Sequence, residues 1–379
     1  MKKLLFDLRC AQPSIDSKFH GGGEYTKTLF DKMVCDHHKK DVEVYAIIDS
    51  KRFLDEWLKE LIKEHDVASF DVPNGSDIKS VINVDEYDIY YLGIAAPHGL
   101  ENSKITKVCT AHDLRDYEEP VDKFSYKYYD RFSEVLKQVV KYKAIKKIRS
   151  RNLNRYKADI LSYDKFITVS YHTEYMVKSS MPEVANIQNG TFYTPSKHLE
   201  EPKPIEGFNE ENFILLVSAN RWIKNAYRAI LAIDNLYSKG IITEKTVLVG
   251  KISNRMSKQI VNKDKFINLD YLDTPQLEYL YSKCKLFAYP TLNEGFGMPP
   301  LEVMRYGKTC LISGLCSLPE LYADTAYYIN PYKIEEIEGR ITMALRNPIS
   351  QEKIKERYNY ITSKQEADLA KACDFIVGK

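Results

Sequence analysis

The sequence predicts an α/β protein with two domains, each built around a parallel β-sheet. At 379 residues the chain exceeds the usual size of one domain and is long enough for two hydrophobic cores. Short apolar runs alternate with helical patterns along the first half, and a second such series begins at Phe213. Strands that alternate with helices form parallel sheets, in which ligands bind at the carboxyl ends of the strands. Each domain should therefore carry functional groups at that edge of its sheet.

The expected first domain spans residues 1–193. Its apolar runs predict strands at 3–8, 42–48, 87–92, 105–110 and 165–169. Helical patterns at about 25–37 and 52–65 lie between the early strands. Residues 194–211 contain three prolines and clustered acids, and they are the expected linker between the domains.

The expected second domain spans residues 212–358. Its apolar runs predict strands at 213–218, 246–249, 266–269, 286–289, 309–312 and 326–329. Helical patterns such as 225–238 and 274–282 fit between these runs. The remaining segment, 359–379, is expected to form a final helix.

Composition narrows the class of protein. Basic and acidic residues nearly balance, at 55 against 53, so the net charge indicates no polyanionic partner such as nucleic acid. The seven cysteines form no CxxC pair, which is typical of thiols in a reducing compartment. Asp7 and Arg9 interrupt the first apolar run, and no run approaches the ~18 apolar residues of a membrane-spanning helix. We therefore expect a cytoplasmic protein, which is compatible with docking at the inner face of a membrane.

A glycine-rich stretch, His20-Gly-Gly-Gly-Glu24, follows the first expected strand. Three glycines before a helix can direct successive amide groups toward a phosphate, and a flexible turn is the alternative. The stretch is not a dinucleotide fingerprint, because Thr26 stands where G-x-G-x-x-G requires the last glycine. An oxyanion hole of the esterase type would need a G-x-S-x-G motif, and the sequence contains none.

The segment 135–158 contains nine basic residues and no acidic one. Apolar residues are interspersed with imperfect periodicity. One interpretation is a surface for anionic lipid headgroups or a pyrophosphate-linked lipid acceptor, with each basic side chain contributing about 1 kcal/mol near such a membrane. The other, slightly favoured, is a solvated helix in a lysine-rich chain.

The most informative stretch follows the expected strand 286–289. Two carboxylates, Glu294 and Glu302, bracket seven residues. Gly295 and Gly297 allow the backbone to pass close to a ligand, and the prolines after Met298 mark the start of a helix. A strand, a glycine-rich loop and a helix start, in this order, can hold sugar hydroxyls and phosphate oxygens. The alternative is a packing unit with two solvated glutamates.

Two cations, Arg221 and Lys224, follow the first expected strand of the second domain. Cations at a strand end can neutralise the diphosphate of a departing nucleotide. The alternative for Lys224 is an exposed lysine at the start of a helix.

The segment 294–302 resembles the E-x7-E signature of the retaining glycosyltransferases of family 4, which have the GT-B architecture of two Rossmann-like domains. The following residues 307–313 and Ser317-Leu-Pro-Glu320 match that family in order and spacing. Asp7-Leu-Arg9, the glycine-rich stretch and His112-Asp-Leu are most similar to mannosyl- and rhamnosyl-type members. The resemblance extends over nearly the whole chain. It implies two domains that face a cleft, an acceptor side in the first, a donor side in the second, and a final helix that crosses back to the first.

The resemblance also implies a role for each motif. His112 contacts the donor sugar near the reacting carbon, Glu294 and neighbouring amides hold that sugar and phosphate, and Glu302 holds the ribose. Ala219 occupies the position at which the family usually has an arginine. Arg221, two residues later, is therefore the candidate to bind the diphosphate in its place. The expected catalytic residues are His112, Glu294 and Lys224. The expected donor-binding residues are Gly22, Gly23, Arg221, Lys224, Tyr271, Leu272, Glu294, Gly295, Phe296, Gly297, Met298 and Glu302.

The implied chemistry breaks a glycosyl–phosphate bond with retention of the anomeric configuration. Negative charge grows on the departing diphosphate, so fixed cations and amides lower the barrier. The chain has no D-x-D motif, and cationic side chains can replace a metal ion. We therefore expect neither a metal nor a cofactor beyond the nucleotide-sugar co-substrate.

The expected function is transfer of a hexose or deoxyhexose from a GDP-mannose, dTDP-rhamnose or UDP-hexose type of donor. The expected acceptor is a glycan or a lipid-linked glycan in surface polysaccharide biosynthesis. One alternative is a sucrose- or trehalose-type synthase or phosphorylase, which would use a soluble acceptor. Another is a non-catalytic scaffold subunit, which only the missing loop arginine supports. Donor sugar, base, acceptor, linkage and oligomeric state are left open by these motifs.

Overall fold

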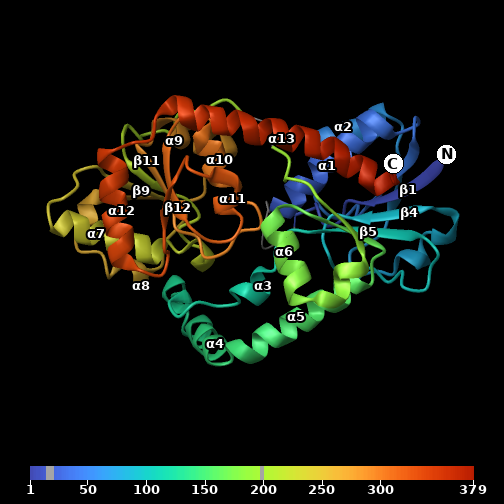
Figure 1. Ribbon diagram of the computed structural model, residues 1–379, viewed down its shortest axis with the longest axis horizontal. Coiled ribbons are helices and arrows are strands. Elements are labelled where there is room, and N and C mark those ends of the chain that lie inside the picture. The colour runs from blue at the N-terminus through green and yellow to red at the C-terminus, as the bar shows by residue number, and fades with distance from the viewer. Residues whose placement is uncertain (14–20, 197–199) are drawn as a thin grey trace. The chain divides into compact units, whose positions relative to one another are not determined.

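The computed structural model describes residues 1–13, 21–196 and 200–379 (Figure 1). The chain forms two compact units. Unit 1 contains residues 1–114, 152–197 and 362–379, and unit 2 contains residues 115–151 and 198–361. Each unit has one parallel sheet, which confirms the expected fold class. Among the helices within the described ranges, none combines the length and apolar character required to cross a membrane.

The sheet of unit 1 has seven parallel strands in the order β3-β2-β1-β4-β5-β6-β7. Its strands are β1 (Lys2–Asp7), β2 (Val42–Ile48), β3 (Ala68–Asp71), β4 (Ile89–Leu92), β5 (Thr106–Ala111), β6 (Lys165–Thr168) and β7 (Gln188–Thr191). The central strands are buried because helices pack on them: Phe6 of β1 contacts Phe30 of the following helix, with ring centroids 5.1 Å apart. The strand order reverses between β1 and β4, which creates a switch point at their carboxyl ends.

The helices of unit 1 include α1 (Gly21–His37), α2 (Glu56–Glu64) and α6 (Tyr171–Ser180). Helix α1 begins at Gly21, so the glycines form its first turn instead of a loop ahead of it, and His20 lies outside the described residues. Two long helices, α5 (Ile145–Leu161) and α13 (Gln351–Val377), contribute residues to both units. The final helix thus starts earlier in the sequence than expected.

The sheet of unit 2 has six parallel strands in the order β10-β9-β8-β11-β12-β13. They are β8 (Ile214–Leu216), β9 (Thr246–Val249), β10 (Phe266–Leu269), β11 (Leu286–Tyr289), β12 (Thr309–Ser313) and β13 (Tyr327–Ile329). Each corresponds to one expected apolar run. The order reverses between β8 and β11, so the loops that follow these two strands diverge at a second switch point.

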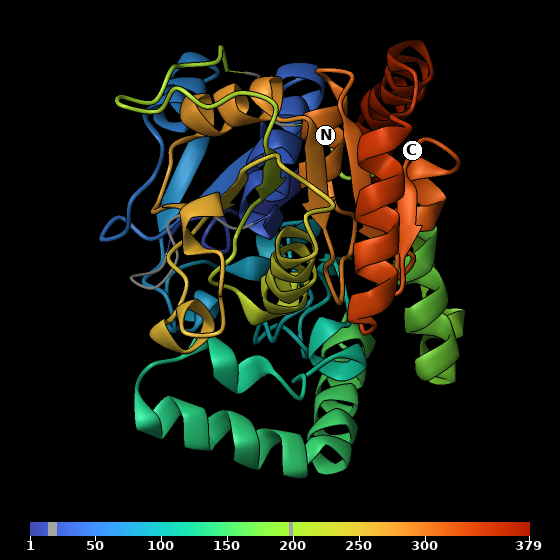
Figure 2. The same ribbon diagram turned by 90° about the vertical axis from the view of Figure 1, so that its left-hand side faces the viewer.

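Helices cover both faces of this sheet (Figure 2). Helices α7 (Ala226–Ser238) and α12 (Ile334–Arg346) pack together in one hydrophobic cluster. Helices α9 (Thr274–Lys283) and α10 (Met298–Met304) pack on the opposite face. The remaining helices of this unit are α3 (Arg115–Glu118), α4 (Phe132–Lys143), α8 (Asn254–Ser257) and α11 (Leu318–Tyr322).

Residues 115–151, which the sequence places in the first domain, belong to unit 2. The physical reason is a buried ion pair and aromatic packing. Arg228 of α7, 1% exposed, donates to both carboxylate oxygens of Asp122 at 3.0 and 2.8 Å. The Tyr128 hydroxyl accepts from the backbone N–H of Tyr227 at 2.8 Å, and Phe124 packs against the same cluster. A charge buried this deeply requires its partner, so the segment is anchored.

The expected linker 194–211 is anchored at both ends. Gln365 of α13 donates to the carbonyl of Thr194 and accepts from the Ser196 hydroxyl at 2.7 Å, within unit 1. In unit 2 the backbone N–H of Lys203 donates to the Pro275 carbonyl at 2.9 Å, and the Phe208 ring is buried. Residues 197–199 lie outside the described part of the chain.

Candidate functional site

The switch point of unit 2 brings Lys224 and Glu294 together. Lys224 ends a 3-10 turn (Trp222–Lys224) that follows β8, and Glu294 lies in the loop that follows β11. The two loops are bonded to each other, because the backbone N–H of Leu292 donates to the carbonyl of Ile223 at 2.8 Å. Residues that are 70 positions apart in the sequence therefore share one edge of the sheet.

Four side chains form a polar cluster there. Lys224 Nζ donates to Glu294 Oε1 at 2.5 Å and to the Tyr289 hydroxyl, and both charged side chains are 12% exposed. The Tyr289 hydroxyl donates to the same Oε1 at 2.7 Å, and the Thr291 hydroxyl does so at 2.8 Å. Among the described residues no donor contacts Glu294 Oε2. One carboxylate oxygen is thus held by three donors, and the other is left to accept from a ligand hydroxyl.

Burial and charge set the protonation of this cluster. Burial would raise the pKa of Glu294, but the charge and hydrogen bond of Lys224, with the two hydroxyl donors, outweigh it and lower the pKa from its ordinary value. Burial lowers the pKa of Lys224, and the adjacent carboxylate only partly restores it. Burial also raises the pKa of the Tyr289 hydroxyl well above its usual range, and Glu294 adds to this effect. Tyr289 is therefore a neutral donor at physiological pH.

Two further cations lie near Lys224. The positive charges of Arg221 and Arg115 both contribute to the lowered pKa of Lys224, so both lie within electrostatic range of its ammonium group. Arg221 is exposed, and its guanidinium pairs with no carboxylate of the described residues. Arg115 was not among the expected site residues, because it follows a strand of the first domain whereas the structure assigns it to unit 2. Three positive charges at one edge favour binding of a polyanionic group.

Asn225 holds Lys224 in place. It is 1% exposed and adopts a left-handed conformation with φ of 57°. Its amide nitrogen donates to the carbonyls of Pro290 and Pro331 at 3.0 and 2.8 Å, and its amide oxygen accepts from Arg228 at 2.8 Å. Asparagine tolerates this conformation better than most residues. The Lys-Asn pair was visible in the sequence, but this cross-linking role was not.

The glycine-rich loop has a backbone conformation that only glycine adopts easily. Gly297 precedes α10 with φ of 100°, and a Cβ atom there would lie 2.5 Å from Leu318 Cδ2. The Tyr322 hydroxyl donates to the Gly297 carbonyl, and the Ser317 hydroxyl donates to the Phe296 carbonyl at 2.7 Å. The Ser-Leu-Pro-Glu motif therefore supports the loop that carries Glu294. Gly295 and Phe296 are buried in this loop, and Met298 is the first residue of α10.

The other expected donor-binding residues of unit 2 lie at two places. Glu302 is half-buried in α10, near the buried hydroxyl of Tyr281, whose pKa is raised by burial and by the Glu302 carboxylate. Tyr271, 71% exposed, and Leu272 lie between β10 and α9. Asp273 caps α9 through a capping box with Gln276, which fixes the end of that loop.

Unit 1 brings its own expected residues together. His112 follows β5, and its Nε2 lies 2.8 Å from the Gly93 carbonyl oxygen, to which it donates. A Cβ atom on Gly22 would lie 3.3 Å from that same Nε2, so the first turn of α1 packs directly against the imidazole. Gly23 is buried in that turn. The glycine-rich stretch and the histidine are therefore neighbours within one unit.

Comparisons with known proteins link the chain to sugar-transferring enzymes. Residues 199–359 match the family described as Glycosyl transferases group 1. Over 85 residues the chain is 39% identical to the serotype-specific mannosyltransferase WbdA of Escherichia coli, covering 22% of this chain and 10% of WbdA. Over 227 residues it is 27% identical to the O-antigen chain mannosyltransferase RfbU of Salmonella typhimurium, covering 59% of this chain and 56% of RfbU. The chain thus spans a tenth to about half of the length of these curated relatives.

A solved structure shares the fold over the full length. The sucrose-phosphate synthase of Thermosynechococcus elongatus superimposes with a TM-score of 0.66, covering 99% of this chain and 98% of that one at 14% identity. At this identity the likeness concerns the fold alone.

Proposed function

We propose that the chain is a retaining glycosyltransferase of the group 1 glycosyl transferases, the family that residues 199–359 match, and that it acts through its GT-B fold. The donor is a nucleotide-diphosphate hexose or deoxyhexose. The names of two relatives, both mannosyltransferases, favour a mannosyl donor such as GDP-mannose over the dTDP-rhamnose and UDP-hexose types. The acceptor is a glycan or lipid-linked glycan in the synthesis of a surface polysaccharide, as the O-antigen role in the name of RfbU suggests.

The observation that carries this proposal is the cluster of Lys224, Tyr289, Thr291 and Glu294. A nucleotide-sugar donor presents a diphosphate and, next to it, sugar hydroxyls. Lys224, with Arg221 and Arg115 in range, supplies positive charge where the diphosphate would depart. Glu294 Oε2, with no partner among the described side chains, supplies an acceptor for a sugar hydroxyl. Charge that grows on the diphosphate makes the first interaction stronger in the transition state, which lowers the barrier.

The remaining expected residues receive supporting roles. We assign the ribose hydroxyls to Glu302, the base to the backbone at Tyr271 and Leu272, and the amides of Gly295–Met298 to the sugar and its phosphate. In unit 1, Gly22, Gly23 and His112 form a joined set, which supports a common role at the reacting sugar. We assign the charge on the leaving group to cationic side chains and propose that neither a metal ion nor a further cofactor is required.

A second observation concerns the membrane. Helix α4 lies at the rim of unit 2 in both views (Figures 1 and 2), and three large apolar residues at helical spacing, Phe132, Leu136 and Val140, are 74%, 51% and 55% exposed. Residues four apart lie on one side of a helix. Lys137 and Lys141 stand beside this apolar row, within the acid-free segment 135–158. We propose that α4 is a peripheral contact with an anionic membrane on the cytoplasmic side, where a lipid-linked acceptor would lie.

The decisive experiment is a donor panel. GDP-mannose, UDP-glucose and dTDP-rhamnose are incubated with the protein, and slow hydrolysis and the shift in melting temperature are measured for the wild type and for Glu294→Ala. We expect one donor to raise the melting temperature of the wild type and to be hydrolysed by the wild type but not by Glu294→Ala, which still binds the diphosphate. If every donor stays intact and none raises the melting temperature, the proposal fails and a scaffold role is favoured.

A further inference from the structure

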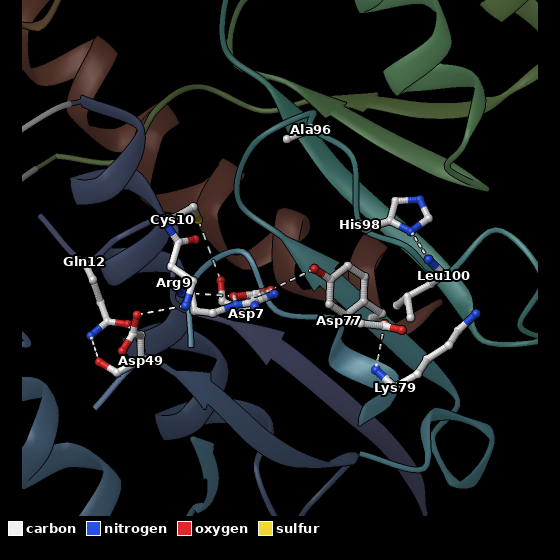
Figure 3. A network of polar contacts seen from close by, with 12 residues as sticks. Asp7, Arg9, Cys10, Gln12, Asp49, Asp77, Lys79, Ala96, His98 and Leu100 are labelled. Carbon is white, nitrogen blue, oxygen red and sulfur yellow. Dashed lines mark hydrogen bonds and ion pairs between the residues drawn. The ribbon is translucent and has the colours of Figure 1, made fainter. Parts of the chain in front are cut away.

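Unit 1 contains a cavity of about 690 Å³ at its own switch point, where the strand order reverses between β1 and β4. Figure 3 shows polar residues that line it, among them Asp7, Arg9 and Asp77. Small-molecule sites typically measure about 300–1,000 Å³, and in parallel sheets they lie at such reversals. The lining comes from the residues after β1, from Arg52 after β2, from the loop after β3 and from the segment after β4. The expected donor-binding residues of unit 1, Gly22 and Gly23, and the expected catalytic residue His112 are not among those that line it.

The Asp7-Leu-Arg9 motif forms one wall. Asp7 is 1% exposed and accepts from the Arg9 backbone N–H at 3.0 Å, from Arg9 Nη2 at 2.7 Å and from the Tyr90 hydroxyl at 2.8 Å. Arg9 Nε also donates to this carboxylate. No described residue accepts from Arg9 Nη1, so this edge of the guanidinium is available to a ligand in the cavity.

A second set of bonds makes the walls rigid. Gln12, 2% exposed, pairs with the backbone of Asp49: its Oε1 accepts from the Asp49 N–H at 2.7 Å, and its Nε2 donates to the Asp49 carbonyl at 2.9 Å. The Asp49 carboxylate accepts from the Asn74 N–H at 2.9 Å, and Arg52 donates to the Gln12 carbonyl at 2.8 Å. The loops after β1, β2 and β3 are thus tied together before any ligand binds.

The charges of the lining cancel. Arg9 and Arg52 face Asp7 and Asp77, and His98 is held as a neutral tautomer, since its Nδ1 accepts from the Leu100 N–H and its Nε2 donates to Ser162. A diphosphate or phosphate requires an excess of positive charge, which this lining lacks. Planar polar side chains beside apolar ones, here Ile78, Leu92, Ile94 and Pro97, suit a ligand with hydroxyl groups on some sides and C–H groups on others.

The cavity adjoins the His112 set. Cys10, in its lining, contacts the Thr26 hydroxyl at 3.7 Å, and that hydroxyl donates to the carbonyl of Gly22, the residue that packs against His112. Gly93, which accepts from His112, stands between the lining residues Leu92 and Ile94. A ligand in the cavity is therefore within one layer of side chains of the imidazole.

We propose that this cavity is the acceptor subsite and that it binds an uncharged sugar residue of the growing glycan through Arg9 and Asp77, in preference to a phosphorylated acceptor. The inference rests on the proposed transferase function, since it names the substrate class of that reaction. In this subsite Arg9 donates from Nη1 to a ring or hydroxyl oxygen of the sugar. Asp77 accepts from a hydroxyl of the sugar at the mouth of the cavity.

Binding is measured without a donor, so that it does not depend on catalysis. Calorimetry and saturation-transfer NMR are carried out on the whole chain with α-1,3-mannobiose and with mannose 6-phosphate. We expect the neutral disaccharide to bind at least about tenfold more tightly than the phosphosugar, and Arg9→Lys and Asp77→Asn each to weaken the disaccharide by about tenfold. Asp77→Asn removes one negative charge from the lining. It should therefore also reduce the factor by which mannobiose binds more tightly than mannose 6-phosphate.

Controls separate this inference from the proposed function. Lys79→Ala, beside Asp77 but outside the lining, should bind like the wild type. Arg9→Lys should keep the wild-type GDP affinity, which shows that the variant is folded. If mannobiose does not bind while a nucleotide does, or if mannose 6-phosphate binds more tightly, the acceptor inference is overturned and the transferase proposal stands. If mannobiose binds as expected but no nucleotide sugar binds or is hydrolysed, the transferase proposal fails and the sugar site stands.

Discussion

Lys224 Nζ lies 2.5 Å from Glu294 Oε1. The residue expected to bind the donor's diphosphate and the residue expected to bind its sugar therefore form an ion pair with each other. The pair is nearly buried, and two hydroxyls support it. Such a pair is preorganised: the lysine is fixed near the position proposed for the departing diphosphate, and only one carboxylate oxygen is committed. The ammonium group has three N–H bonds and uses two of them here, which leaves one for a phosphate oxygen.

The first prediction separates the roles of the two partners. Glu294→Gln keeps the shape of the side chain but removes its charge and its second acceptor oxygen for a sugar hydroxyl. We expect donor hydrolysis and transfer to fall by about 10²–10³-fold, while affinity for the bare nucleoside diphosphate is unchanged or tighter, because Lys224 loses a competing anion. Calorimetry with GDP and GDP-mannose, beside turnover measurements, checks this. Equal losses of GDP and GDP-mannose affinity would contradict the assignment of Glu294 to the sugar.

The second prediction concerns pH. Lys224 must be protonated to bind a diphosphate, and burial lowers its pKa from the ordinary 10.5. GDP affinity should therefore decline as pH rises, and the decline should begin below the pH at which an exposed lysine titrates. Lys224→Arg, which stays charged, should flatten this alkaline limb even if it binds GDP more weakly. The pKa of Glu294 is lowered from 4.5, so its ionisation should impose no acidic limb above that pH. A profile that is identical in the wild type and Lys224→Arg would refute the role of Lys224.

The third prediction concerns metal removal. Three cationic side chains near the expected diphosphate position make a divalent ion unnecessary for charge neutralisation. Transfer should keep more than about half of its rate after treatment with EDTA, and added Mg²⁺ or Mn²⁺ should restore nothing beyond the untreated rate. A complete loss with EDTA that Mn²⁺ reverses would show that a metal ion does what is assigned here to Lys224 and its neighbours.

The fourth prediction tests the loop. Gly297→Ala forces a side chain into φ of 100° and places a methyl group 2.5 Å from Leu318 Cδ2. We expect a loss of about 1–3 kcal/mol in the free energy of unfolding and a higher KM for the donor. Gly339→Ala is the matched control, because Gly339 lies in α12 and a Cβ there meets nothing within 4 Å. That change should leave stability equal or raised by about 0.5–1 kcal/mol. Thermal and urea unfolding of both variants measures the difference.

The fifth prediction tests α4. Leu136→Glu places a negative charge in the exposed apolar row, so co-sedimentation with phosphatidylglycerol vesicles should fall several-fold relative to the wild type. Transfer to a water-soluble acceptor should not change. Val261→Glu, at an apolar residue of unit 2 that is 78% exposed, is the control and should sediment like the wild type. Equal binding of all three proteins to phosphatidylglycerol, or equal binding of the wild type to phosphatidylcholine vesicles, would exclude α4 as an anionic-membrane contact.

Much of the fold was predictable because buried parallel strands are almost continuously apolar. All four residues of β4 and of β11 are buried, for example, and both strands were located. Strand β3 was missed, since it lies at the sheet edge and its residues are largely exposed. The start of α1 was placed too late because glycines usually indicate a loop, whereas here they begin the helix.

The site was predictable in its members but not in its connections. The E-x7-E spacing indicated Glu294, and the cation at a strand end indicated Lys224, yet nothing local indicates that they bond to each other. Arg115 and Asn225 were missed as site components for the same reason, since their roles depend on contacts with distant residues. Assignment of 115–151 to the wrong unit follows from one such contact, Asp122 with Arg228, 106 positions apart.

That ion pair has a consequence for protein engineering. A fragment cut at 199–359, the span of the recognised family segment, would keep Arg228 and lose Asp122. The buried guanidinium would then keep its bond to Asn225 but have no counter-charge, and such a fragment should be insoluble. Chimeras that exchange donor specificity between relatives need to carry 115–151 together with the carboxy-terminal half. The two gene segments that encode them are separate and must be exchanged together.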